Sequence, residues 1–202
     1  MKTSAPILIF GYGSLMSKAS LHATVPNAKN LRAAYIKNFR REFSKMDDEG
    51  MVDTNADIAG VPYCAVDVIS GYDGEFVNGI IFETDETYLA ALKRREYGYE
   101  LLPVDAYDFR TGRPLGTCFV FSSNIRNGVY DYDNLAQTRY LELCLNGAKE
   151  YGKTFYKQFL ASTYVNHEQL DMLPRLTGKV RWQSAKKHKS LTRQTYRPSF
   201  LT

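Results

Sequence analysis

The order of strand-like and helix-like segments constrains the fold of this chain more than any other feature of its sequence. Six segments have the apolar or alternating patterns of strands: residues 7–10, 31–43, 61–69, 76–82, 101–109 and 115–121. Only a brief helix at 17–21 and a short amphipathic helix at 85–95 stand between them. Because parallel strands need crossovers of a dozen or more residues, the pattern predicts an α+β protein with a mixed or mostly antiparallel sheet that can curl into a barrel.

The second half of the chain is predicted to be helical after the last of these strands. Asn134–Tyr151 is the strongest predicted helix, and Phe155–Leu160 continues helical after the break at Gly152. The segment "RTGRP" reads as a hairpin loop between two strands, and Asp53–Asp57 belongs to a polar loop. A chain of 202 residues is long enough for one domain with a substantial core.

The basic charge of the protein is concentrated at its C-terminus. Residues 178–202 carry seven basic and no acidic residues, so the remaining 177 carry 19 of the 26 basic residues and all 22 acidic ones. We therefore predict a domain at 1–177 and a basic C-terminal extension at 178–202. The favoured interpretation of the extension is a solvated tail. The alternative is that its cations, with Trp182, Tyr196 and Phe200, bind nucleic acid or an anionic surface.

Cysteine and histidine usage argues against metal chemistry. The three cysteines are odd in number, and neither they nor the three histidines show the paired spacing of a zinc site. Reduced thiols fit a cytoplasmic protein better than a disulfide scaffold. No segment has the length of a membrane span or the pattern of a signal peptide. We expect a cytoplasmic protein without metal, cofactor or membrane span, and without nucleic acid as its favoured partner.

The segment "PILIFGYGSLM" (6–16) is an apolar strand that ends abruptly in two glycines around a tyrosine. It is no dinucleotide fingerprint, because Met16 stands where the third glycine belongs, and it has no P-loop lysine. Ser14 lacks the G-x-S-x-G setting of a serine nucleophile. Two interpretations remain: a tight turn, or a loop whose successive N–H groups hold a carboxylate or a developing oxyanion.

Three segments together resemble the γ-glutamylcyclotransferase superfamily, which includes the ChaC-like glutathione-degrading enzymes and the γ-glutamylamine cyclotransferases. They are "FGYGSLM", "LKRREYGYELLPVDAY" (92–107) and "YLELCLNGAKEYG" (140–152), and they occur in the order expected of that superfamily. The resemblance implies a small mixed β-barrel with helices outside it. It also implies a small γ-glutamyl compound as substrate and no cofactor.

The resemblance assigns a role to each matching residue. It implies a substrate-cradling loop, a general acid/base and a substrate-contacting tyrosine: Gly11, Tyr12, Gly13, Ser14 and Leu15 in the loop, Glu96 as the acid/base, and Tyr140 as the tyrosine. Many members have an aspartate near the start of the second segment, where Leu92 or Lys93 stands here, and a glycine after the glutamate, where Tyr97 stands. From the residues alone, Tyr140 fits a core tyrosine equally well.

The implied reaction explains why a carboxylate is needed. The α-amine of the γ-glutamyl group attacks its own γ-carbonyl, closes a 5-oxoproline ring and expels the attached amine. Because an α-amino group is largely protonated at neutral pH, a carboxylate must take its proton, and burial that raises the pKa of this carboxyl helps. Arg94 and Arg95 would lower the pKa of Glu96, so we expect both to point to solvent. Glu100 and Asp105 are the rival carboxylates.

The sequence therefore predicts a γ-glutamyl cyclotransferase that acts on a γ-glutamyl amino acid, amine or peptide, with glutathione among the candidates. Two other classes of protein stay open. In one, the barrel binds a γ-glutamyl-like ligand without turning it over. In the other, the basic extension makes the chain a nucleic-acid- or surface-associated protein. The expelled amine and the oligomeric state are left undetermined.

Overall fold

The computed structural model describes residues 6–49, 60–123 and 125–177. The strands are β1 (Ile7–Gly11), β2 (Lys29–Lys37), β3 (Phe39–Asp47), β4 (Tyr63–Ser70), β5 (Phe76–Thr84), β6 (Glu100–Asp108), β7 (Pro114–Ser122), β8 (Thr163–Val165) and β9 (Glu168–Gln169). The helices are α1 (Lys18–Thr24), α2 (Glu86–Arg95), α3 (Leu135–Lys149), α4 (Lys153–Ala161) and α5 (Pro174–Thr177), with 3-10 turns η1 (Ser14–Met16) and η2 (Leu170–Met172). The predicted loop at 53–57 and extension at 178–202 lie outside the described residues.

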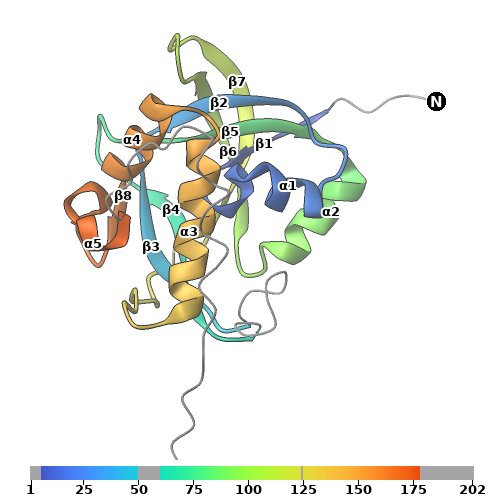
Figure 1. The fold of residues 1–202 in the computed structure, drawn as a ribbon. Coiled ribbons are helices and arrows are strands. Elements are labelled where there is room, and N and C mark those ends of the chain that lie inside the picture. Colours follow the sequence, from blue (N-terminus) through green and yellow to red (C-terminus); the bar gives the residue numbers. More distant parts are fainter. Residues whose placement is uncertain (1–5, 50–59, 124, 178–202) are drawn as a thin grey trace, which may run out of the picture.

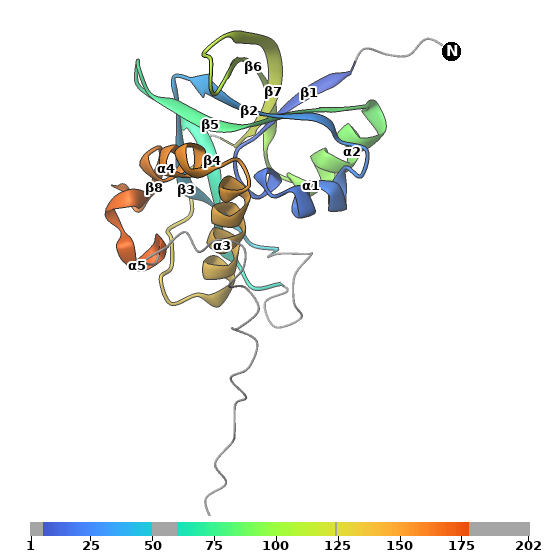
Figure 2. The same cartoon turned by 45° about the horizontal axis from the view of Figure 1, so that its top comes forward.

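Five strands close into a barrel in the order β1-β5-β2-β6-β7 (Figures 1 and 2). The neighbouring strands run antiparallel except β1 and β7, which pair in parallel and close the barrel. The prediction of an α+β protein with a mixed, mostly antiparallel barrel and helices around it is therefore confirmed. A second, four-stranded sheet in the order β4-β3-β8-β9 lies beside the barrel.

The prediction of one long strand over 31–43 is wrong. The chain forms β2 in the barrel and β3 in the second sheet, with Asn38 between them at a φ of 62°. The Asn38 N–H donates to the Glu75 carbonyl, and the Asn38 carbonyl accepts from Gly71. Asparagine tolerates this left-handed conformation better than most residues, so one residue sends the chain from one sheet to the other.

The predicted helices are confirmed, and their local signals explain their ends. Ser17 caps α1 by accepting from the Ser20 N–H, and Asn134 caps α3 by accepting from the Gln137 N–H. On α3, Gly147 faces the turn before α1, where a Cβ would lie 2.5 Å from the Ser17 nitrogen. Only a glycine lets α3 pack this closely against the segment that follows β1.

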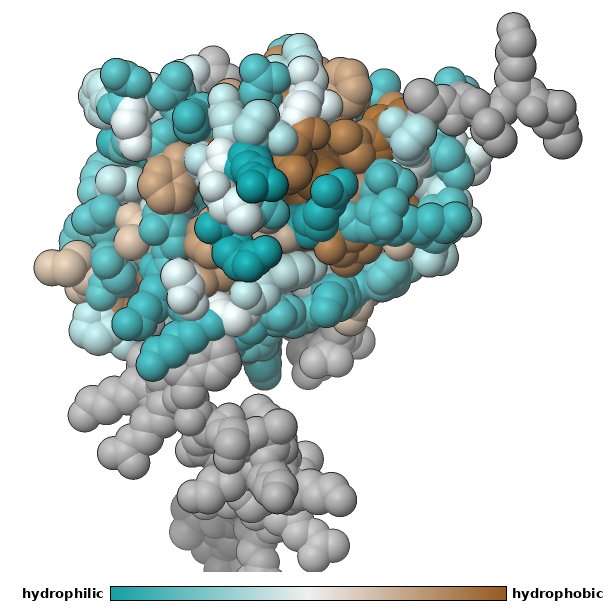
Figure 3. Space-filling view, turned by 90° about the horizontal axis from the view of Figure 1, so that it is seen from above, coloured by the Kyte–Doolittle hydropathy of each residue, from teal (hydrophilic) through white to brown (hydrophobic). Residues whose placement is uncertain are grey.

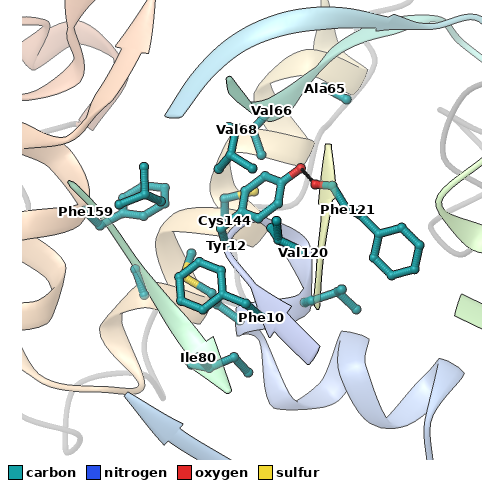
Figure 4. Packing of buried hydrophobic residues seen from close by; sticks show 14 of the residues in the cluster. Phe10, Tyr12, Ala65, Val66, Val68, Ile80, Val120, Phe121, Cys144 and Phe159 are labelled. Carbon is teal, nitrogen blue, oxygen red and sulfur yellow. Dashed lines mark hydrogen bonds between the residues drawn. The ribbon is translucent and has the colours of Figure 1, made fainter. Parts of the chain in front are cut away.

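One buried hydrophobic cluster joins the barrel to α3 and α4. Figure 4 shows part of it, with the Tyr12 ring among aliphatic side chains and its hydroxyl directed at the Phe121 carbonyl. Outside, hydrophobic side chains gather on the face seen in Figure 3, near the start of β1. Within the described ranges, the chain has no helix of the length and apolarity that crossing a membrane requires.

Candidate active site

The loop after β1 is held so close to its surroundings that it needs its glycines. A Cβ on Gly13 would lie 2.7 Å from Cγ1 of Val66 and 3.3 Å from the Tyr140 hydroxyl. From Gly13 the chain turns into η1, where the Met16 N–H donates to the Gly13 carbonyl at 3.0 Å. The loop is thus pressed between β4 and α3.

Three N–H groups of this loop have no acceptor among the described residues. In the described part of the chain, no hydrogen-bond acceptor serves the N–H groups of Gly13, Ser14 and Leu15. The first N–H groups of any helical turn lack partners within the turn. Neighbouring unpaired N–H groups favour a carboxylate or an oxyanion. Of the two interpretations of this loop, the anion-holding loop has the donors that it requires.

Glu96 stands at the end of α2, where the chain turns toward β6. Its N–H donates to the Leu92 carbonyl at 2.8 Å, and its carbonyl accepts from the Tyr99 N–H at 3.1 Å. The turn between them uses Gly98, which has a φ of 76°. The glycine that the superfamily pattern places directly after the glutamate is therefore found one residue later, where a positive φ requires it.

The loop and Glu96 line one cavity, although they are far apart in the sequence. Its lining residues are Phe10, Tyr12, Gly13, Ser14, Leu15, Val66, Glu96, Phe121 and Tyr140. None of these nine residues carries a positively charged side chain. The cavity measures about 20 Å³, roughly the room for one water molecule.

The other predicted residues lie away from this cavity. Gly11 ends β1 beneath the loop, where a Cβ would lie 2.8 Å from Cβ of Leu15, so it supports the loop and does not line the cavity. The rival carboxylates Glu100 and Asp105 are exposed on β6, and Asp105 accepts a hydrogen bond from the Thr117 hydroxyl at 3.0 Å. Glu96 is thus the carboxylate that shares a cavity with the loop.

The environment of Glu96 disfavours its charged form. Burial is the largest influence and raises the pKa of this carboxyl, and Asp47 acts in the same direction. Arg95 and Lys45 lower the pKa of Glu96 but do not outweigh burial. A carboxyl with a raised pKa can both accept and donate a proton close to neutral pH, which is what general acid/base chemistry requires.

Four tyrosines lie within the electrostatic influence of Glu96. Burial raises the pKa of Tyr12, Tyr63, Tyr99 and Tyr140, and the Glu96 charge adds to the increase in each case, so all four stay protonated. Three of their hydroxyls are bonded to the backbone: Tyr12 donates to the Phe121 carbonyl at 2.7 Å, Tyr99 donates to the Val66 carbonyl at 3.2 Å, and Tyr140 accepts from the Val66 N–H at 3.4 Å. Sequence reasoning missed Tyr63 and Tyr99, since no spacing relates them to Glu96.

The expectation that Arg95 points to solvent is wrong. Its side chain is 20% exposed, and its Nε lies 3.3 Å from Oε1 of Glu96. Its terminal nitrogens donate to η1 and α1. Arg94, in contrast, is exposed as expected. A signal for this difference was present in the sequence, because Arg95 follows the buried Leu92 by three positions and shares its side of the helix.

No metal site is apparent in residues 6–49, 60–123 and 125–177, which contain no cluster of three or more histidine, cysteine or acidic side chains suited to an ion. Cys64, Cys118 and Cys144 are free and buried. Burial raises the pKa of each thiol to about 12, so these cysteines are thiols and not thiolates.

The closed mixed barrel can now be compared with known proteins. The chain belongs to the ChaC-like family, because the family model described as "ChaC-like protein" matches residues 7–147. A search of the curated proteins found no match.

Solved structures agree with this fold. A γ-glutamyl cyclotransferase is similar at 18% identity with a TM-score of 0.60, over 85% of this chain and 99% of that one. An uncharacterized human protein is similar at 18% identity with a TM-score of 0.56, over 84% and 98%. A yeast γ-glutamyl cyclotransferase described as specific to glutathione is similar at 14% identity with a TM-score of 0.54, over 84% and 97%. At these identities the likeness establishes the fold.

Proposed function

We propose that this protein is a γ-glutamyl cyclotransferase that converts a γ-glutamyl amino acid, amine or peptide into 5-oxoproline and the free amine. The observation that carries the proposal is that Glu96 shares a cavity with the unpaired N–H groups of Gly13, Ser14 and Leu15. Family membership and the activity named for two structural neighbours support the same class of reaction. Glutathione is one candidate substrate.

Binding in this proposal relies on the loop. Since no lining side chain is positively charged, the α-carboxylate or the γ-carbonyl oxygen of the substrate would be held by the N–H groups of the loop. Tyr140 would contact the substrate from α3, and Tyr12 and Phe121 would form the opposite wall. These contacts would fold the substrate so that its amine lies next to its own γ-carbonyl, which removes an entropic cost of the reaction.

The proton transfers in this proposal belong to Glu96. Its carboxylate accepts a proton from the α-ammonium group, and the neutral amine attacks the γ-carbon to form the five-membered ring. The negative charge that develops on the γ-oxygen is stabilised by the loop N–H groups. As the bond between the γ-carbon and the leaving nitrogen breaks, the Glu96 carboxylic acid returns the proton to the departing amine. The ring nitrogen then loses its second proton, which the expelled amine takes up to leave as an ammonium ion. No nucleophile from the protein is needed.

The decisive experiment is an assay of 5-oxoproline release from a panel of γ-glutamyl amino acids, amines and peptides, glutathione included. We expect Glu96→Gln to lower turnover by about 10²–10⁴-fold while ligand binding is kept, because the amide cannot take up the proton. Glu100→Gln, on the exposed side of β6, serves as the matched control and should stay at wild-type turnover. Unchanged turnover in Glu96→Gln would remove this residue from the mechanism.

Two outcomes would favour the other classes of protein. Tight binding of γ-glutamyl compounds by the wild-type chain without 5-oxoproline release would indicate a binding protein. A steeply salt-dependent affinity for nucleic acid that is lost on deletion of 178–202 would give the extension a role of its own. The domain at 1–177, the cytoplasmic location and the small γ-glutamyl partner remain parts of this proposal.

A further inference from the structure

We propose that Arg95 is the positioning residue of the site, which fixes the Glu96 carboxylate relative to the loop that follows β1. This inference rests on the proposed function. The Arg95 side chain does not line the cavity. It contacts two residues that do, Glu96 and Ser14.

The guanidinium group joins three elements at one point. One terminal nitrogen donates to the Ser20 carbonyl at 2.9 Å and the Thr24 hydroxyl at 2.7 Å. The other donates to the Ser14 hydroxyl at 3.0 Å and the Ser20 hydroxyl at 2.8 Å. The remaining nitrogen, Nε, forms the ion pair with Glu96. The end of α2 is thereby tied to η1 and α1, and all three nitrogens are used.

This arrangement requires the shape of arginine. A guanidinium is planar and presents its donors in a fixed fork, so bonds on one edge hold the direction of the other edge. The hydrogen bonds to Ser20 and Thr24 on α1 therefore fix the position at which Nε meets the Glu96 carboxylate. The hydrogen bond to Ser14 ties the loop after β1 to the same guanidinium. Lysine would keep the positive charge but would lack the fixed geometry.

The helix pair that carries these groups is fastened at both ends. At the start of α2, the Asn27 side-chain amide donates to Asp85 at 3.0 Å, and Asp85 also caps the helix. At the other end, Arg95 forms the cross-connection between α2 and α1. Since the ion pair with Glu96 is at this second end, loss of Arg95 would free the part of α2 that holds the carboxylate.

Arg95 also acts on the protonation of Glu96. Eight titratable or charged groups interact electrostatically with this carboxyl. Three carry charge: Arg95 from α2, and Lys45 and Asp47 from β3. The others are neutral: Tyr12 from the loop after β1, Tyr63 from β4, Tyr99 from the turn before β6, and Tyr140 and Cys144 from α3. Of the two cations among them, Arg95 lowers the pKa of Glu96 more. It therefore limits the increase that burial causes and keeps a larger share of the carboxylate at neutral pH.

The test compares Arg95→Met with Arg94→Met, its exposed neighbour. Two quantities are measured: the pH profile of kcat/KM for 5-oxoproline release, and the titration of the Glu96 carboxyl followed by ¹³C NMR and assigned by its loss in Glu96→Gln. In Arg95→Met we expect the carboxyl to titrate at higher pH, the acidic limb of the profile to move the same way, and turnover to fall by about 10–100-fold. Arg94→Met should match the wild type in both.

Two further variants separate positioning from charge and from folding. Arg95→Lys keeps the charge and should titrate close to the wild type while turnover stays low. The double variant Ser20→Ala/Thr24→Val removes anchors outside the cavity and should lower kcat with little change in titration. An unmoved titration in Arg95→Met would overturn the proposal, as would full turnover in Arg95→Lys. Because the titration does not depend on activity, a wild type without turnover would contradict the proposed function and still leave the effect of Arg95 on the Glu96 carboxyl measurable.

Discussion

Two pairs of adjacent arginines lie in different parts of the molecule, Arg40-Arg41 in β3 and Arg94-Arg95 in α2. In each pair the second side chain is more buried than the first. Arg40 forms an ion pair with Glu75 at 2.6 Å, and Arg94 is exposed. Arg41 is fully buried, whereas Arg95 keeps 20% exposure beside the cavity. The same dipeptide has thus been used once to hold the fold and once, in our proposal, to hold the site.

The contacts of Arg41 explain its structural role. It donates from β3 to the Asn78 side chain on β5 and to the Thr163 hydroxyl on β8, and its guanidinium lies 4.3 Å from the centre of the Phe159 ring. Barrel and second sheet are joined there. Burial lowers the pKa of Arg41 to about 9. Arg41 is enclosed by the hydrophobic core. Arg95, in contrast, contacts Glu96, and Glu96 lines a cavity.

The largest expected effect is on stability and belongs to Arg41. Arg41→Ala should lower the free energy of unfolding by about 4 kcal/mol, because it opens a cavity and leaves buried acceptors without donors. Arg40→Ala, the matched neighbour, should cost about 0.5 kcal/mol, as expected for a partly exposed ion pair. Urea titrations of both variants measure this difference. Equal losses would contradict the division of roles between the two arginines.

A smaller effect is expected at the loop of the site. Gly13→Ala should cost about 1–3 kcal/mol and reduce turnover, because its Cβ would overlap Cγ1 of Val66 and push the loop out of place. Adding Val66→Ala removes the overlapping atom and should restore part of the stability. A double variant no more stable than Gly13→Ala would refute this explanation.

The smallest effect is a gain in stability at the site itself. Burial raises the pKa of Glu96 in the folded protein. The contribution of Glu96 to stability is therefore fully present below the ordinary pKa of a carboxyl, where the group is protonated. This contribution is lost as pH rises through the raised pKa, because the buried carboxyl must then ionise. Glu96→Gln should therefore unfold at a higher temperature than the wild type at pH 7–8, and this advantage should disappear near pH 4. Thermal melts across this pH range provide the check. A variant that is less stable at pH 8 would contradict the direction of the shift.

The fold could be predicted where its signals are local. Strand alternation, the caps at Ser17 and Asn134 and the length of α3 are all visible in short windows of sequence. The break at Asn38 was missed because apolar alternation continues through it, and a single residue in the left-handed region leaves no pattern. The break could be recognised only from the strand partners, since β2 pairs with β5 and β6 whereas β3 pairs with β4 and β8.

The site was harder to predict, because its parts meet only in the folded chain. The glycines of the loop after β1 marked it as a candidate site in the sequence. Glu96 was identified by the superfamily resemblance and not by the residues alone. Tyr63 and Tyr99 come from other elements, and their approach to Glu96 depends on how β4 and the turn before β6 pack. The inward position of Arg95 could have been predicted, because it lies three residues after Leu92 on the same side of α2. A row of charged residues is more often exposed, and that interpretation was preferred.

The close contact at Gly147 has a consequence for how the protein is made. The loop after β1 leaves the ribosome early, whereas α3, which packs against the turn before α1, is synthesised only after all the barrel strands. Until that helix arrives, nothing braces the turn on that side. A nascent chain that ends before α3 would thus lack both this support and Tyr140, and its cavity would be complete only once α3 docks.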